Sequence, residues 1–145
     1  MTSMPPLLLL AEGRQPRVLR RTAQVRPRES ALHFQVAKLL RDHALPEWRW
    51  THFPAGEIRD KIAASKLKNM GLQRGWPDFV LISPAAIAHA LELKRAGEDL
   101  TEDQEAFRDW CCGHGVPHAV VRSIDEALAI LTSWSALRIR IGGVR

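Results

Sequence analysis

Two short apolar segments that carry charged residues constrain the fold of this chain most strongly. The first is DFVLI at 78–82 and the second is HALELK at 89–94. Their length and their apolar content predict strands, and the short connection predicts that they pair as a hairpin. Side chains alternate between the two faces of a strand, so Glu92 and Lys94 are expected on one side. Pairing would also bring Asp78 to Glu92 at one end of the sheet.

Two acids and a lysine at the end of a sheet predict chemistry on an anion. Two adjacent carboxylates repel each other unless one is protonated or a cation lies between them. Mg²⁺ suits such a site, since it takes one or two carboxylates together with water and substrate phosphate. Lys94 could hold or deprotonate an attacking water, or offset charge on phosphorus. The structural alternatives are a salt bridge between Glu92 and Lys94 and a turn role for Asp78 after Pro77.

The first predicted helix opens at Pro27 and reads ESALHFQVAKLLRDH. Its apolar stripe recurs at every fourth position: Leu32, Val36 and Leu40. Glu29 and His33 lie along the same side, three and four residues from members of that stripe. An acid at the edge of a buried stripe suggests a site that needs it.

The remaining patterns predict alternating strands and helices. We expect a strand at 48–53, a helix at 58–70 ended by Gly71, a helix at 101–113, a strand at 117–122 and a helix at 123–134. TEDQ and SIDE, at residues 101–104 and 123–126, predict capping boxes at the starts of the last two helices. The order αβαββαβα predicts an α/β domain with a mixed central sheet flanked by helices.

Charge is distributed unevenly along the 145 residues, whose net charge is +5. Residues 1–28 hold six arginines against one acid, and the rest of the chain is balanced. We therefore expect a flexible basic arm at 1–26, a folded domain at 27–136 and a C-terminal tail at 137–145. The arm suits nucleic acid before membrane, although it could equally be a solvated leader. The basic stretch in the folded body is 58–76.

The cysteine and hydropathy patterns predict a cytoplasmic protein. Cys111 and Cys112 are adjacent, which offers neither a metal-binding spacing nor a disulfide framework, and they fit small apolar residues in a reducing compartment. The apolar run near the N-terminus is too short for a signal peptide, and no apolar stretch is long enough to span a membrane.

The motifs resemble a known family. PD at 77–78 with ELK at 92–94 is similar to the signature of PD-(D/E)XK nucleases. The wider frame resembles the VRR-NUC branch of that superfamily: a G-x-PD strand, the E-x-K strand, a glycine-containing turn, LTEDQ, a helix and a strand that ends in RSIDEA. The resemblance covers residues 29–134. It implies a restriction-endonuclease-like core and a phosphodiesterase that acts on DNA with Mg²⁺, for which Mn²⁺ could substitute.

The resemblance also implies roles for individual residues. Asp78 and Glu92 match the metal-binding acids, Lys94 matches the catalytic lysine, and Glu29 matches an acid that the superfamily often adds to the metal site. Gln104 matches a glutamine that often supports the site. The alternative for Glu29 is a favourable acid in the first turn of a helix, and the alternative for Gln104 is a plain capping box.

Further side chains are candidates for contact with DNA. They are His33, His52, Lys66, Lys68, Arg74 and Trp76. His52 could instead be a core histidine beside Trp50, His33 could be ordinary helix surface, and Trp76 could pack at the start of the strand rather than stack on a base. In related chains the segment that corresponds to WRWTHFPAG often carries Asn after the proline, where this chain has Ala55, so substrate contacts in that loop are open.

Together these observations predict a small metal-dependent endonuclease. Its size leaves no room for a separate recognition domain, so we expect selectivity for branched, flap or junction DNA, and stand-alone relatives suggest a homodimer. The alternatives are an inactive nucleic-acid-binding module of the same fold and a nuclease that acts on RNA. Paired acids argue against the binding module, because they repel an anionic ligand.

Overall fold

The computed structural model describes residues 27–54 and 60–138, except for the side chains of residues 27–29. Its elements are α1 (Pro27–His43), β1 (Arg49–His52), α2 (Lys61–Asn69), β2 (Phe79–Ile82), β3 (Ala88–Leu93), α3 (Glu102–Gly113), β4 (His118–Val121) and α4 (Ile124–Ser133). This is the predicted order, and the α/β class with a restriction-endonuclease-like core is confirmed. The predicted arm at 1–26, Ala55 and residues 139–145 of the predicted tail lie outside the described residues.

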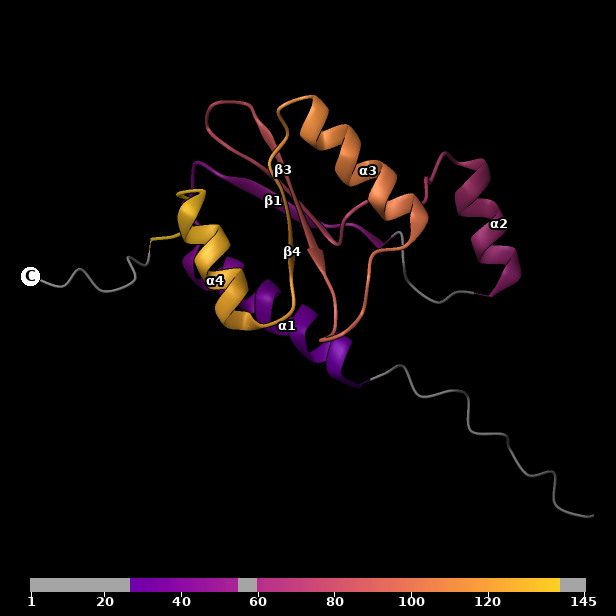
Figure 1. Cartoon of the computed structure of the whole chain (residues 1–145), viewed down its shortest axis with the longest axis horizontal. Helices are drawn as coiled ribbons and strands as arrows, with labels where there is room; N and C mark the ends of the chain where they lie inside the picture. Colours follow the sequence, from indigo (N-terminus) through magenta and orange to yellow (C-terminus); the bar gives the residue numbers. More distant parts are fainter. Residues whose placement is uncertain (1–26, 55–59, 139–145) are drawn as a thin grey trace, which may run out of the picture.

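The sheet has four strands in the order β1-β2-β3-β4. The first three are antiparallel neighbours, and β4 runs parallel to β3 after the crossover through α3. The predicted hairpin is confirmed, with Phe79 of β2 opposite Leu91 of β3. Figure 1 shows α1 and α4 together on one face of the sheet, α3 on the other face, and α2 standing apart at one side.

The core lies between the sheet and the α1–α4 pair. The predicted stripe of α1 is buried, with Leu32, Val36 and Leu40 exposing 8%, 0% and 1% of their surface. They pack with buried side chains of the sheet, α4 and the segment after it: Phe79, Leu81, Leu91, Leu93, Val121, Ala127, Leu131, Ala136 and Leu137. Burial of these apolar side chains is the main term that holds the layers together.

Strand β3 is covered on both faces. Leu91 and Leu93 belong to the core beneath α1 and α4, while Glu92 points to the opposite face and receives a hydrogen bond from Gln104 of α3. Glu92 exposes only 4% of its surface. A carboxylate at that depth is costly unless protons, donors or a cation compensate it.

The predicted start of the second helix was wrong. The helix begins at Lys61, because Asp60 has an extended backbone and its side chain accepts a hydrogen bond from the Ala63 N–H. Asp60 is therefore the N-cap rather than a helical residue. Residues 58 and 59 lie outside the described residues. The predicted end is confirmed, since Gly71 follows Met70 with a φ of +101°.

The capping box predicted for α4 forms only in half. Ser123 caps the helix by accepting from the Glu126 N–H, as expected. The Glu126 carboxylate instead accepts from the backbone N–H of Arg122 at 2.6 Å, one residue before the cap. The box predicted for α3 is complete, with Thr101 and Gln104 exchanging both hydrogen bonds.

Aromatic and sulfur side chains differ in their burial. His89 lies edge-on between Trp48 and Trp134, 4.9 Å from each ring centroid, and its burial lowers its pKa. Trp110 is largely exposed and stacks on His114. Cys111 is buried, whereas Cys112 is exposed, so only Cys111 fits the predicted apolar role.

No helix in the described ranges is both long and apolar enough to cross a membrane.

Candidate active site

The two predicted acids meet at the end of the hairpin. Asp78 stands just before β2 and Glu92 lies near the end of β3. The Oδ2 atom of Asp78 accepts a hydrogen bond of 2.7 Å from the backbone N–H of Leu93, which fixes the carboxyl against the neighbouring strand. The Glu92 carboxyl group lies near enough to affect the pKa of Asp78. Two neighbouring carboxylates repel each other unless a proton or a cation lies between them.

The pKa of Asp78 reflects this environment. Burial raises the pKa of Asp78 above its ordinary value, while the Leu93 N–H, the neighbouring His52 and Lys94, and the Glu92 carboxyl group act in the opposite direction. Burial prevails because loss of water penalises the charged carboxylate. Without a cation, Asp78 therefore keeps its proton to a higher pH than an exposed aspartate does.

Gln104 connects α3 to the carboxylates. Its Nε2 atom donates to Oε1 of Glu92 at 2.7 Å, while its Oε1 atom accepts from the Thr101 N–H at 2.9 Å. The capping box thus sets the position of the amide that holds Glu92. The two roles considered for Gln104, helix capping and contact with the acids, are combined in one side chain.

His52 lies against the backbone of Asp78. Its Nδ1 atom donates to the Asp78 carbonyl at 3.0 Å, and the same carbonyl accepts from the Phe53 N–H at 2.8 Å. The ring of His33 meets His52 edge-on at 4.3 Å and lies 4.7 Å from the Phe79 ring. Both histidines, predicted from the sequence as DNA contacts, are therefore packed beside the acidic pair.

Gly75 allows the loop that leads to Asp78 to contact the start of α3. Its φ is +82°, and a Cβ atom at this position would lie 2.3 Å from the carbonyl oxygen of Asp103. Only glycine fits both the backbone conformation and this spacing. The loop before β2 can therefore touch the helix turn that carries Gln104, the residue that holds Glu92.

Lys94 lines an open pocket of about 450 Å³ just past β3. The other lining residues are Leu32, Arg95, Ala96, Gly97, Glu98 and Arg122. Arg95 pairs with the Glu98 carboxylate at 3.0 Å, and Arg122 donates to the Glu98 carbonyl at 2.9 Å. The Lys94 ammonium is close enough to lower the pKa of both Asp78 and Glu98. Lysine and the acidic pair thus occupy the same end of the sheet.

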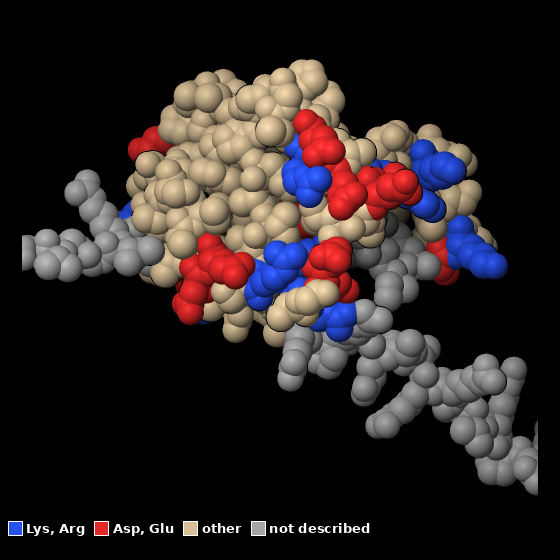
Figure 2. Space-filling model, viewed as in Figure 1, with Lys and Arg blue, Asp and Glu red and all other residues tan. Residues whose placement is uncertain are grey.

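The remaining predicted residues lie around this centre. Trp76 packs between Phe53, at 5.3 Å, and Phe107, at 5.1 Å, which gives it a packing role at the start of the strand. Glu29 falls in the first turn of α1, but its side chain is outside the described part of the chain. Lys66, Lys68 and Arg74 are exposed. Figure 2 shows basic side chains of α2 beside acidic side chains of α3.

The acidic pair suits a hard divalent cation. The half-buried carboxyl group of Asp78 and the buried one of Glu92 are oxygen ligands of the kind that Mg²⁺ takes, with waters completing its shell. Within the described side chains, no group of three or more His, Cys, Asp or Glu residues is placed to hold a metal ion. The side chain of Glu29, the predicted third acid, lies outside the described part of the chain.

The family model of the VRR-NUC domain matches residues 16–125. The chain belongs to the VRR-NUC family. VRR-NUC domains are part of the PD-(D/E)XK nuclease superfamily, so this is a nuclease-type, DNA-processing domain. The match starts at residue 16, within the segment predicted as the arm. No curated protein and no solved structure matches the chain.

Several features of this VRR-NUC site were missed by sequence reasoning. The Leu93 N–H that fixes Asp78 and the His52 bond to the Asp78 carbonyl both depend on strand register, which no local pattern reveals. Arg122 secures the turn that follows Lys94 through the Glu98 carbonyl. The glycine of GWPD, Gly75, could be read from the sequence. Its close approach to the Asp103 backbone explains why a glycine is needed at this position.

Proposed function

We propose that this chain is a metal-dependent endonuclease that hydrolyses DNA phosphodiester bonds and prefers branched, flap or junction DNA. The observation that carries the proposal is the placement of half-buried Asp78 and buried Glu92 beside Lys94 at the end of the hairpin. Membership of the VRR-NUC family supports the nuclease class. Structure selectivity extends the proposal beyond the nuclease-type, DNA-processing class that the family match supports.

In this proposal Asp78 and Glu92, joined by Glu29 from α1, hold Mg²⁺, for which Mn²⁺ can substitute. When bound, the ion supplies electrostatic stabilisation of the charge that develops on the phosphate. A cation between the two carboxylates would relieve their mutual repulsion. Gln104 keeps Glu92 in place through its 2.7 Å hydrogen bond.

Lys94 orients the attacking water and stabilises negative charge on the phosphate. Lys94 is partly buried and lowers the pKa of Asp78. Its positive charge therefore lies next to two acids that would otherwise repel the substrate. Water adds to phosphorus, the P–O bond to the leaving oxygen breaks, and the water's proton passes through solvent to the leaving oxygen.

The phosphate contacts in this proposal come from Lys66, Lys68 and Arg74, which are exposed on α2 and the loop after it. The other side chains that the sequence predicts as DNA contacts, His33, His52 and Trp76, pack against neighbouring rings and backbone. We further propose a homodimer that cuts two strands of a junction, and a cytoplasmic location, to which the free cysteines are suited. Gel filtration at working concentration tests the dimer, and a single-subunit mass would rule it out.

A cleavage assay tests the function. Linear duplex, single-stranded, flap and four-way-junction DNA, together with single-stranded RNA, are each incubated with the chain in EDTA, Mg²⁺ or Mn²⁺. We expect metal-dependent cutting of branched DNA and a loss of about 10²–10⁴-fold in Lys94→Ala. Lys38→Ala is the control, since Lys38 pairs with Asp42 on the surface of α1. Binding without cutting would indicate an inactive module, and cutting of RNA alone would reassign the substrate.

A further inference from the structure

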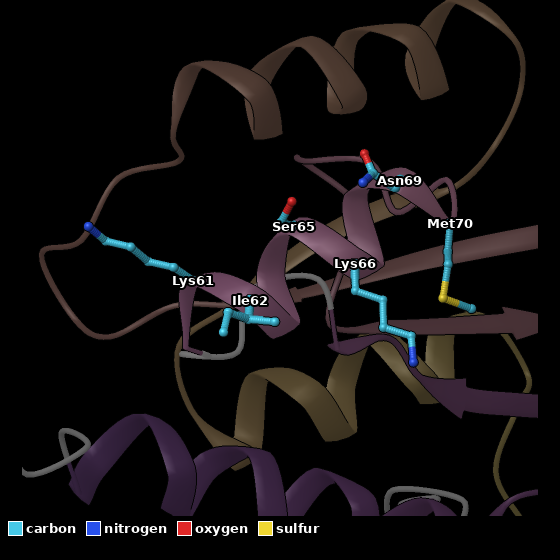
Figure 3. Close-up of a pocket in the computed structure, with 6 residues that line it drawn as sticks. All are labelled: Lys61, Ile62, Ser65, Lys66, Asn69 and Met70. Carbon is cyan, nitrogen blue, oxygen red and sulfur yellow. The ribbon is translucent and has the colours of Figure 1, made fainter.

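The helix α2 exposes an amphipathic stripe that the rest of the described chain does not cover. Ile62 and Met70 expose 84% and 72% of their surface, and α2 has no buried residue. Figure 3 shows Ile62, Lys66 and Met70 extending on one side of the helix, and Ser65 and Asn69 on the other. Positions 62, 66 and 70 repeat every four residues, which aligns them. We call Ile62, Lys66 and Met70 the α2 stripe.

A nine-residue helix with no buried side chain gains little from packing within its own chain. Its hydrogen bonds to the described residues are those within the helix, the Asp60 cap and the turn formed by Met70, Gly71 and Leu72. An external surface that covers Ile62 and Met70 would therefore stabilise it. The residues lining the shallow pocket on this helix all belong to α2 or its cap.

Charge selects among the surfaces that could cover the stripe. Lys66 lies within the stripe, Lys61 and Lys68 lie on the same helix, and Arg74 lies in the loop that follows it. No ion pair involving these four residues is present among the described residues, where Asp60 is engaged as the helix cap. In a twofold interface the same patch meets itself, so a second copy would place these cations against one another. Like charges facing each other oppose association. A polyanion such as a nucleic acid avoids this repulsion between like charges.

The position of α2 links it to the acidic pair. The segment 71–77 leads from the helix directly to Asp78, and within it Gly75 touches the Asp103 backbone at the start of α3. In Figure 1 α2 stands beside that end of α3, away from α1 and α4. A nucleic acid held by α2 would thus lie next to the site proposed for cleavage.

We propose that the α2 stripe recognises DNA whose base stacking is already interrupted. Lys66 meets a phosphate, while Ile62 and Met70 cover base faces that an intact duplex keeps stacked. Apolar side chains on DNA-binding surfaces commonly insert at base steps, and unstacking costs least where a base is unpaired. The inference rests on the proposed nuclease function, and it identifies the element that would distinguish branched or bulged DNA from regular duplex.

Binding measurements on two DNAs test this inference. The full chain carrying Lys94→Ala, which prevents cutting, is titrated in Mg²⁺ against a blunt duplex and against the same duplex with a bulge of a few unpaired nucleotides. We expect Ile62→Ser with Met70→Ser to weaken binding of the bulged DNA about tenfold and binding of the duplex less than about twofold. Lys66→Ala with Lys68→Ala should weaken both equally and reduce the salt dependence.

The matched control is Ile82→Ser with Ile87→Ser, two exposed isoleucines at the other end of the β2–β3 hairpin. These should leave both affinities unchanged. Unaltered binding by the Ile62→Ser and Met70→Ser variant, or equal loss on both DNAs, would overturn the inference. So would a fall in oligomeric mass in that variant, which would assign the stripe to a second copy.

Cleavage by the unmodified chain is measured in parallel. If the unmodified chain cuts no nucleic acid but the bulge-specific loss is seen, the nuclease proposal fails and the role of the stripe stands. If it cuts branched DNA and the stripe variant retains full preference for the bulge, the inference fails alone.

Discussion

The side-chain amide of Gln104 bridges a helix cap and a buried acid, since it donates to Glu92 at 2.7 Å and accepts from the Thr101 N–H at 2.9 Å. The capping box therefore does more than begin α3. It fixes the rotamer of the side chain that holds Glu92. Local helix geometry is in this way transmitted to the candidate metal ligand.

We predict that Gln104→Ala lowers both stability and activity. Loss of the cap should cost about 1 kcal/mol, and loss of the support for Glu92 should lower the cleavage rate about 10- to 100-fold. Thermal unfolding and a cleavage time course measure the two effects. Ser123→Ala is the control, because Ser123 caps α4 with no hydrogen bond to either acid. Equal loss of cleavage in both variants would mean that Gln104 acts through stability alone.

We predict that Asp78→Asn stabilises the metal-free protein. Burial raises the pKa of Asp78 in the folded state above the ordinary value of 3.8. Between these two values the folded state binds more protons than the unfolded state, so the stability contributed by this carboxyl falls as the pH rises through that window. Asparagine cannot ionise, and its Oδ1 atom can still accept from Leu93.

Calorimetry in EDTA as a function of pH checks this. The variant should exceed the unmodified chain in stability above the window, and the difference should vanish as the pH falls to the lower end. Mg²⁺ at about a hundred times its Kd should stabilise the unmodified chain by about 2.7 kcal/mol and the variant by less. Parallel pH curves for the two proteins would contradict the assignment of Asp78 as a buried acid and metal ligand.

We predict that His52→Phe lowers the cleavage rate about tenfold without altering DNA affinity. Phenylalanine keeps a ring beside His33 and Phe79 but removes the donor to the Asp78 carbonyl. Binding titrations and single-turnover rates at saturating DNA separate the two effects. Reduced affinity with an unchanged rate would instead support the DNA contact that the sequence predicts for His52.

We predict that Gly75→Ala destabilises the fold by about 3 kcal/mol or more, because the new Cβ atom adds a clash to a strained backbone. The Asp103 carbonyl oxygen would lie 2.3 Å from it. Gly71→Ala is the matched control: its φ is also positive, at +101°, but no atom lies within 4 Å of the added methyl group. That variant should lose about 1 kcal/mol. Equal losses in urea unfolding would exclude the proposed close contact.

Much of the fold was predictable because local patterns and tertiary contacts agree. The stripe Leu32, Val36 and Leu40 has a helical period and is buried along one side of α1. Thr101 and Gln104 form the predicted capping box, since its groups lie within one helix turn. The capping box predicted for SIDE is only half formed, because the Glu126 carboxylate accepts from the Arg122 N–H instead of the Ser123 N–H.

The sequence by itself determined the element order, the hairpin and the meeting of Asp78 with Glu92, because alternation and turn length fix which side chains share a strand end. Only the tertiary structure decided what surrounds that pair. The Leu93 N–H, the His52 ring and the Gln104 amide come from separate elements, and their approach depends on sheet register and on the space that Gly75 leaves beside Asp103. Local periodicity carries no information about such distances, since they arise when the layers pack together.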